Sequence, residues 1–138
     1  MARILAIDYG MKRCGIAVTD PLQLIATALD TIDTPLLESY ILKYCSGEPV
    51  EKIIFGLPTH ADGNDTSLTP VIRIFQEKLK KLLPAISFDF HDEAFSSSKA
   101  KETIFNMGIK KKQRRDKRLV DKISAVIILQ EYLGHHIY

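Results

Sequence analysis

Short apolar runs separated by turns open the chain and predict strands. Residues 3–8 form one such run, and residues 14–19 form a second run after a turn at residues 11–13. The tight spacing of the two runs predicts an antiparallel hairpin. A third strand is expected within residues 25–32. We therefore expect the N-terminal part of the chain to form a three-stranded meander.

Strand and helix patterns alternate after this meander. The expected elements are a helix at 34–45, a strand at 52–55, a helix at 67–83, a strand at 86–90, a helix that begins at 96–98 and ends at 108, and a helix at 119–133. In the helix at 67–83, apolar residues recur at helical spacing, and we expect them to face the core. They are Val71, Ile74, Phe75, Leu79 and Leu82.

This order of elements predicts the fold class. A meander followed by strands that alternate with helices is typical of an α/β protein with a mixed sheet and helices on both faces. A chain of 138 residues has the size of a single domain with a full core, so we expect one domain over residues 1–138.

Composition places the chain among soluble globular proteins. Its apolar content is 46% and its mean hydropathy is −0.01. No apolar run approaches the roughly 18 residues of a membrane helix, and the N-terminus lacks the pattern of a signal peptide. Cys14 and Cys45 are therefore expected to be reduced, packed thiols in a cytoplasmic protein.

The positive charge of the chain is concentrated in one segment. Residues 110–118 carry seven bases and one acid, so the segment has a charge of +6 and the remainder of the chain a charge of −4. A basic segment on a slightly acidic body is typical of contact with a polyanion, although a solvated charged loop is the alternative. The bases expected to contact substrate are Lys111, Lys112, Arg114, Arg115, Lys117 and Arg118.

Three carboxylates, Asp8, Glu93 and Asp121, occupy positions from which a fold can aim them at one point. Asp8 ends a buried strand, Glu93 follows a later strand, and Asp121 lies in a largely apolar helix. Carboxylates in such places are costly to desolvate unless they are paired or hold a cation. The three residues therefore indicate a divalent-metal site and phosphate chemistry.

Each acid also has a simpler interpretation. Asp8 would cap a turn, and Asp121 would favour the positive end of a helix dipole. Asp92 and Glu93 are neighbours whose side chains point in different directions, so the pattern alone does not choose between them. Arg13, on the turn beside Asp8, would either reach a phosphate or form a surface ion pair.

Four motifs recur in the order of a known family. Residues 8–15 fit D-x-G-x-x-R-x-G; Gly56-Leu57-Pro58 precedes Asp62-Gly63; Asp92-Glu93 precedes Ser96-Ser97; and Asp121 precedes Ser124-Ala125 and Ile128-Leu129-Gln130. This set resembles the YqgF family of Holliday-junction-resolvase-like, pre-16S rRNA nucleases. The resemblance covers residues 4–133.

The resemblance implies a bacterial protein with a ribonuclease-H-like fold and a five-stranded mixed sheet. It implies an endo- or exonuclease that hydrolyses phosphodiester bonds during maturation of the small-subunit ribosomal RNA. Asp8, Glu93 and Asp121 would then bind two Mg²⁺ or Mn²⁺ ions, roughly 3.5–4 Å apart. The family also selects Glu93 over Asp92 and gives Arg13 a phosphate to bind. One departure is Ala94, where the family usually has arginine.

Two other functions stay open at this stage. A DNA junction resolvase would use the same three acids, and a non-catalytic RNA-binding factor in ribosome assembly or transcription would keep the fold without turnover. The choice between RNA and DNA depends on 2′-hydroxyl contacts and groove shape. We expect structured RNA, with branched DNA as the alternative, and a monomer or weak homodimer.

Overall fold

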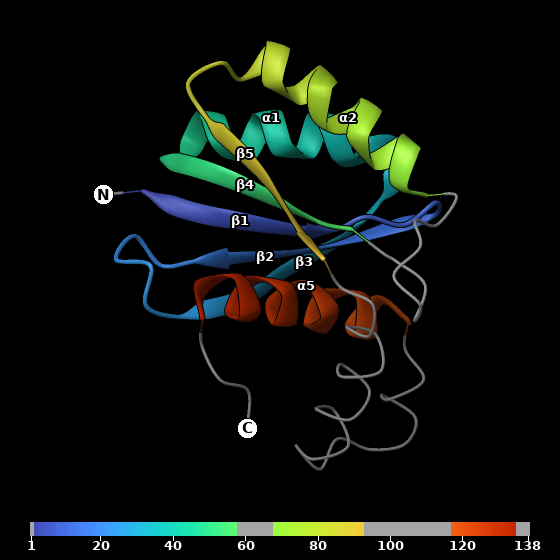
Figure 1. The fold of residues 1–138 in the computed structure, drawn as a ribbon. Helices are drawn as coiled ribbons and strands as arrows, with labels where there is room; N and C mark the ends of the chain where they lie inside the picture. Colours follow the sequence, from blue (N-terminus) through green and yellow to red (C-terminus); the bar gives the residue numbers. More distant parts are fainter. Residues whose placement is uncertain (1, 58–67, 93–116, 135–138) are drawn as a thin grey trace.

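The computed structural model describes residues 2–57, 68–92 and 117–134. Within these residues the core of the fold is a five-stranded sheet, with the strands in the spatial order β3-β2-β1-β4-β5 (Figure 1). The strands are β1 (Arg3–Asp8), β2 (Arg13–Thr19), β3 (Ala26–Asp33), β4 (Val50–Leu57) and β5 (Ser87–Asp92).

The sheet is mixed, as the order of sequence elements predicts. β1, β2 and β3 form an antiparallel meander, whereas β4 pairs in parallel with β1, and β5 pairs in parallel with β4. The parallel pairs require crossover connections, and the α/β pattern supplies helices for them. As a result, β1, β4 and β5 all end at the same edge of the sheet, where Asp8 and Asp92 are the last strand residues.

Helices cover both faces of the sheet (Figure 1). On one face, α1 (Leu37–Gly47) and α2 (Thr69–Leu82) pack over a core that includes Leu5 and Ile7 of β1. On the other face, α5 (Lys117–Leu133) packs over a smaller cluster that includes Ile4 and Ala6. Side chains of β1 therefore alternate between the two layers, as the geometry of a strand requires.

The buried stripe of α2 differs from the expected one. Ile74 is 72% exposed and Leu82 is 46% exposed, so the prediction that these two residues face the core is wrong. The helix buries Leu79 as expected, and it also buries Ile72 and Gln76. The buried Gln76 side chain donates a hydrogen bond from Nε2 to the Asp89 main-chain oxygen at 3.1 Å, and this partner lets a polar residue occupy the core face.

The first helix also begins later than the sequence predicts. Thr34–Leu36, which contains the proline, forms a 3-10 turn, η1, and the α-helix starts at Leu37. The helix expected at 96–108 lies outside the described residues. No helix in the described part of the chain is long and apolar enough to cross a membrane.

Candidate nucleic-acid cleavage site

Asp8 and Gly15 lie opposite each other in the β1–β2 ladder. Directly paired residues of an antiparallel ladder carry their side chains on the same face of the sheet. Ile4 and Ala6, which precede Asp8 at steps of two, pack in the cluster beneath α5. The Asp8 side chain is therefore on the α5 face, at the edge where the parallel strands end.

Gly15 is the point at which α5 touches the sheet. A Cβ atom at this position would overlap the main-chain oxygen of Asp121 and lie 3.0 Å from the main-chain nitrogen of Lys122. Only glycine allows the helix backbone to approach β2 this closely. The contact places the Asp121 backbone over the residue that is paired with Asp8, so two of the three predicted acids lie at the same edge.

Arg13 contributes a positively charged side chain to this edge. Its Nε donates a hydrogen bond to Asp121 Oδ2 at 3.0 Å, and the two side chains are 27% and 25% exposed. Arg13 lies two residues before Gly15 on β2 and so points to the same face. The ion pair that the sequence offered as an alternative for Arg13 is present, but it is made with a predicted site residue and is partly buried.

The negative charges of both acids contribute to the pKa of the nearby Cys14 thiol. Burial raises its pKa most, hydrogen bonds with Thr34 and the Gly10 main-chain oxygen oppose the rise, and the charges of Asp8 and Asp121 add to it. The thiol is fully buried. Its environment stabilises the neutral form, so Cys14 is a packing residue, as the sequence predicts.

Arg118 makes contacts that were not foreseen from the sequence. Its guanidinium donates to the main-chain oxygen of Thr31 at 2.8 Å and to Asp33 Oδ1 at 3.1 Å. Thr31 in turn donates its hydroxyl hydrogen to the Arg118 main-chain oxygen at 2.6 Å. These bonds anchor the first turn of α5 to β3 and help to hold Asp121 in place.

Several predicted site residues lie beyond the described part of the structure. Glu93 is among them, together with four bases of the basic segment. The backbone of Lys117 begins α5, and its side chain is outside the description. The bases outside the described residues are Lys111, Lys112, Arg114 and Arg115.

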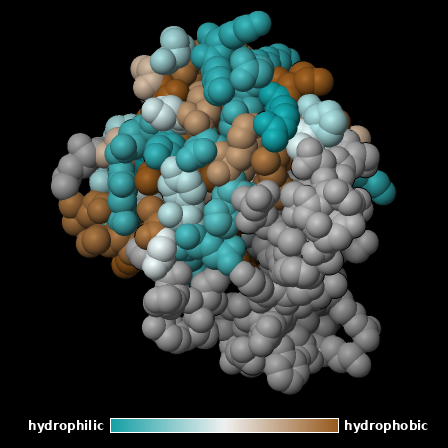
Figure 2. All heavy atoms as spheres, in the orientation of Figure 1, coloured by the Kyte–Doolittle hydropathy of each residue, from teal (hydrophilic) through white to brown (hydrophobic). Residues whose placement is uncertain are grey.

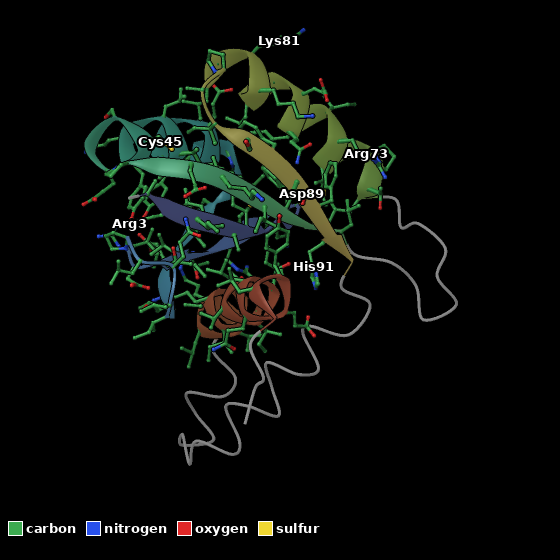
Figure 3. The ribbon with its side chains drawn as sticks, turned by 60° about the vertical axis from the view of Figure 1, so that its left-hand side comes forward. Arg3, Cys45, Arg73, Lys81, Asp89 and His91 are labelled. Atoms are coloured by element: carbon green, nitrogen blue, oxygen red, sulfur yellow. The ribbon has the colours of Figure 1, made fainter. Side chains whose placement is uncertain are left out.

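A second polar group on the α5 face was missed by the sequence analysis. Lys52 Nζ donates to Tyr132 Oη at 2.8 Å, and the Tyr132 hydroxyl donates to Asp89 Oδ2 at 2.8 Å. His91 Nε2 lies 3.4 Å from Glu131 Oε1. Asp89 and His91 lie on the strand face opposite Phe88 and Phe90, and both point toward α5 (Figure 3). The alternation of polar and aromatic residues in β5 was the available signal.

The donor chemistry of the edge suits a hard divalent cation. Asp8 and Asp121 supply carboxylate oxygens, which Mg²⁺ and Mn²⁺ prefer. The positively charged Arg13 guanidinium already lies beside the Asp121 carboxylate, where a cation would bind. Among the described residues, no three His, Cys, Asp or Glu side chains come together as a metal group. Glu93, the third acid that the sequence predicts, lies outside the described residues.

Comparison with known proteins identifies the family. A model of the RuvX family, described as Holliday junction resolvase, matches residues 2–135. The chain belongs to this family. The match confirms the family prediction made from the four motifs. Membership of the RuvX family and the fold together support a hydrolytic nuclease.

Relatives of this RuvX-family chain are similar over nearly their whole length. A protein of Porphyromonas gingivalis is 49% identical over 135 residues, which cover 98% of each chain. A protein of Phocaeicola vulgatus is 50% identical over 133 residues, which cover 96% of each chain. Both are named "Putative pre-16S rRNA nuclease".

Two solved structures share the fold. RuvC of T. thermophilus in complex with a Holliday junction substrate matches with a TM-score of 0.58 and 13% identity, over 97% of both chains. Another Thermus thermophilus RuvC structure matches with a TM-score of 0.52 and 12% identity, over 96% of both chains. The likeness confirms the ribonuclease-H-like α/β fold.

Proposed function

We propose that this RuvX-family protein is a divalent-metal-dependent nuclease that hydrolyses phosphodiester bonds in the precursor of 16S ribosomal RNA, in the cytoplasm. The observation that supports the proposal is that Asp8 pairs with Gly15 and the Asp121 backbone packs against the same glycine, on the sheet edge where β1, β4 and β5 end. The choice of pre-16S ribosomal RNA as the substrate is supported by the names of the relatives. The fold shared with RuvC supports a nuclease that depends on a divalent metal.

In this proposal Asp8, Asp121 and Glu93 hold Mg²⁺ or Mn²⁺. Such cations, if held there, would supply activation of a water molecule and stabilisation of the leaving oxygen. Asp8 is fixed by the β1–β2 ladder, and Asp121 by the contact of α5 with Gly15. These positions come from rigid elements, so little reorganisation is needed when the substrate arrives.

Arg13 has a second role in the proposal. Its ion pair with Asp121 neutralises one carboxylate while the cation is absent. If Asp121 held a divalent cation through the same oxygen, the Arg13 guanidinium would be free to bind a phosphate of the substrate. The bases that precede Arg118 in the 110–118 segment would bind further phosphates of the same strand.

A DNA junction resolvase is the second candidate. It is favoured by the description of the RuvX family and by the RuvC fold, and it requires the same carboxylates. A non-catalytic RNA-binding factor is the third function, and it predicts binding without cleavage.

One assay separates the three. Labelled ribosomal RNA precursor and a DNA four-way junction are each incubated with the protein in Mg²⁺, Mn²⁺ or Ca²⁺, with Asp8→Asn as the control. Cleavage of the RNA in Mg²⁺ or Mn²⁺, absent in Ca²⁺ and in the variant, supports the proposal. Cleavage of the junction alone supports the resolvase. Binding of RNA with no cleavage of either substrate shows that the nuclease proposal is wrong.

A further inference from the structure

The outer face of α2 is strongly basic. Four of its residues, Arg73, Lys78, Lys80 and Lys81, are bases, whereas Glu77 is its one acid. All five side chains are exposed. Figure 2 shows hydrophilic side chains gathered over this helix. The helix therefore carries a net charge of +3 on a surface that the cleavage site does not use.

An open groove of about 420 Å³ runs along this face. It is lined by residues one turn apart on α2, which are Arg73, Ile74, Glu77, Lys78 and Lys81. Long basic side chains combine an aliphatic stem with a charged end, so such a wall offers both apolar contact and positive charge. Such a groove presents charge to an extended polyanion at several points along one line.

The groove begins near the sheet edge that carries the cleavage site. The Arg73 guanidinium lies 5.0 Å from the ring centre of Phe90, which is two residues before the end of β5. Figure 3 shows Arg73 at the end of α2 near the end of β5, and Lys81 at the far end of the helix. Eight residues separate the two bases, which is about 12 Å along the helix axis.

We infer that this surface, Arg73 to Lys81 of α2, binds a double-stranded arm of the nucleic-acid substrate through its phosphates. A duplex carries one phosphate charge per about 1.7 Å when both strands are counted, so a segment as long as this groove carries about seven charges, of which only some face the groove. Proteins that bind single strands instead offer aromatic rings for stacking. No exposed aromatic side chain lies on α2, and the Phe90 ring is covered by Arg73.

Existing ion pairs on the helix do not compete strongly with phosphate. Lys78 contacts Glu38 at 2.8 Å and Lys80 contacts Glu77 at 3.2 Å, but the two lysine side chains are 62% and 44% exposed. Exposed pairs contribute at most about 1 kcal/mol and weaken as salt rises. Lys81 forms no ion pair with any described residue. It is therefore the base most available to a ligand and the one to test.

The inference rests on the proposed function, because it names the shape of substrate that the same site would cut. The substrate would have a cleavage point at the sheet edge and a duplex arm that extends over α2. RNA precursors with stems and branched DNA both have this shape, so the surface does not by itself choose between them.

The test compares Lys81→Glu with Lys43→Glu. Lys43 is an exposed lysine on α1, away from the α2 groove, so the two variants change the net charge equally. Binding is measured by fluorescence anisotropy, in Ca²⁺ and at several salt concentrations. The probes are two RNA hairpins with the same single-stranded tail, one with a stem long enough to reach Lys81 and one with a stem too short to do so.

Lys81→Glu is expected to weaken binding of the long-stem probe and to reduce its log–log salt slope by about 0.7–0.9, the value for one phosphate contact. The two variants, Lys81→Glu and Lys43→Glu, should bind the short-stem probe with equal affinity. Equal effects of the two variants on the long stem would overturn the inference. In that case cleavage by the wild-type protein would still support the nuclease, and the exposed Ile74 would indicate a protein partner for the groove instead.

Discussion

Arg13 Nε donates a hydrogen bond to Asp121 Oδ2 at 3.0 Å, although the two residues are 108 positions apart in the chain. The pair joins the start of β2 to the first turns of α5. It neutralises one carboxylate at an edge where Asp8 adds a second negative charge. Arg13 therefore supplies positive charge beside two neighbouring carboxylates.

Replacing Arg13 by glutamine is expected to have opposite effects on stability and on metal binding. The metal-free protein should lose about 0.5–1 kcal/mol of unfolding free energy, as for a well-formed but partly exposed pair. Affinity for Mn²⁺ should rise, because a competing cation has been removed from Asp121. Chemical denaturation and calorimetric titration measure the two quantities. Lys12→Gln, at the exposed neighbouring residue, is the control; equal Mn²⁺ affinities in the two variants would contradict the competition.

Gly15→Ala is expected to destabilise the protein by about 1–3 kcal/mol, the usual cost of forcing an extra methyl group into a packed contact. The new Cβ would overlap the Asp121 main-chain oxygen, so α5 must move away from β2. The displacement should also weaken Mn²⁺ binding, because Asp121 would move relative to Asp8. Urea denaturation and metal titration test both effects.

Gly47→Ala is the matched control for this substitution. A Cβ at Gly47 meets no atom within 4 Å, and the residue ends α1. Alanine should therefore leave stability unchanged or raise it by up to about 1 kcal/mol through helix propensity. If both alanine variants have the same stability, the close approach at Gly15 does not position the helix.

The sequence predicts a set of three acids, but not the contacts that position Asp8 and Asp121. Asp8 ends an apolar strand, and the strand pattern alone places it at an edge of the sheet. The pairing of Arg13 with Asp121 depends on where α5 crosses β2, and that is decided by the missing side chain of Gly15. A motif records that glycine and arginine are present, but not which distant residue they contact.

The error in α2 has a comparable origin. In the sequence, Ile74 fits the helical spacing of the apolar residues. In the structure, Ile72 and Gln76 occupy the core face and Ile74 is exposed. Gln76 is buried because the Asp89 main-chain oxygen accepts its hydrogen bond. A hydrophobic pattern cannot foresee such a partner, because it treats every amide as a surface residue.

Asp8→Asn and Asp121→Asn are both expected to abolish cleavage, because an amide is a weaker ligand for a hard cation than a carboxylate. Their stabilities should differ. Asp121→Asn breaks the ion pair with Arg13 and should cost the metal-free protein about 0.5–1 kcal/mol. Asp8→Asn removes one of two neighbouring negative charges and should leave the protein folded. Cleavage assays and thermal unfolding in EDTA test this; residual cleavage by either variant would remove that residue from the ligand set.

Tyr132→Phe is expected to raise the pKa of Asp89 toward its ordinary value. The Tyr132 hydroxyl bond is the largest cause of the lowered pKa, followed by the Phe90 amide hydrogen bond. An ionised Asp89 stabilises the wild-type fold at pH values above about 3.8. That contribution is lost as the pH falls through the lower pKa of the folded state, so the stability difference between the two proteins should shrink in acid. A carbon-detected NMR titration of the Asp89 carboxyl gives the pKa, and an unchanged value would mean that the hydroxyl bond is not formed in solution.

Substitutions should distinguish the bases before α5 that bind substrate from Arg118, which stabilises the fold. Replacing Lys111, Arg114 and Arg115 together by glutamine should flatten the log–log salt dependence of RNA binding by about 2–3 units, at about 0.7–0.9 per lost phosphate contact. Arg118→Gln should mainly lower stability, because the guanidinium holds Thr31 and Asp33 of β3.

The measurements are binding at several salt concentrations and chemical denaturation of both variants. An unchanged slope in the triple variant would make the basic segment a solvated linker. A slope change in Arg118→Gln as large as one contact, without any loss of stability, would show that Arg118 leaves β3 to bind phosphate. The ion pair with Asp33 is about half exposed on both sides, so exchange of its carboxylate for a phosphate is cheap, whereas the bond to the buried edge of Thr31 is not. That difference is why we expect Arg118 to stay with the helix start and the preceding bases to bind the substrate.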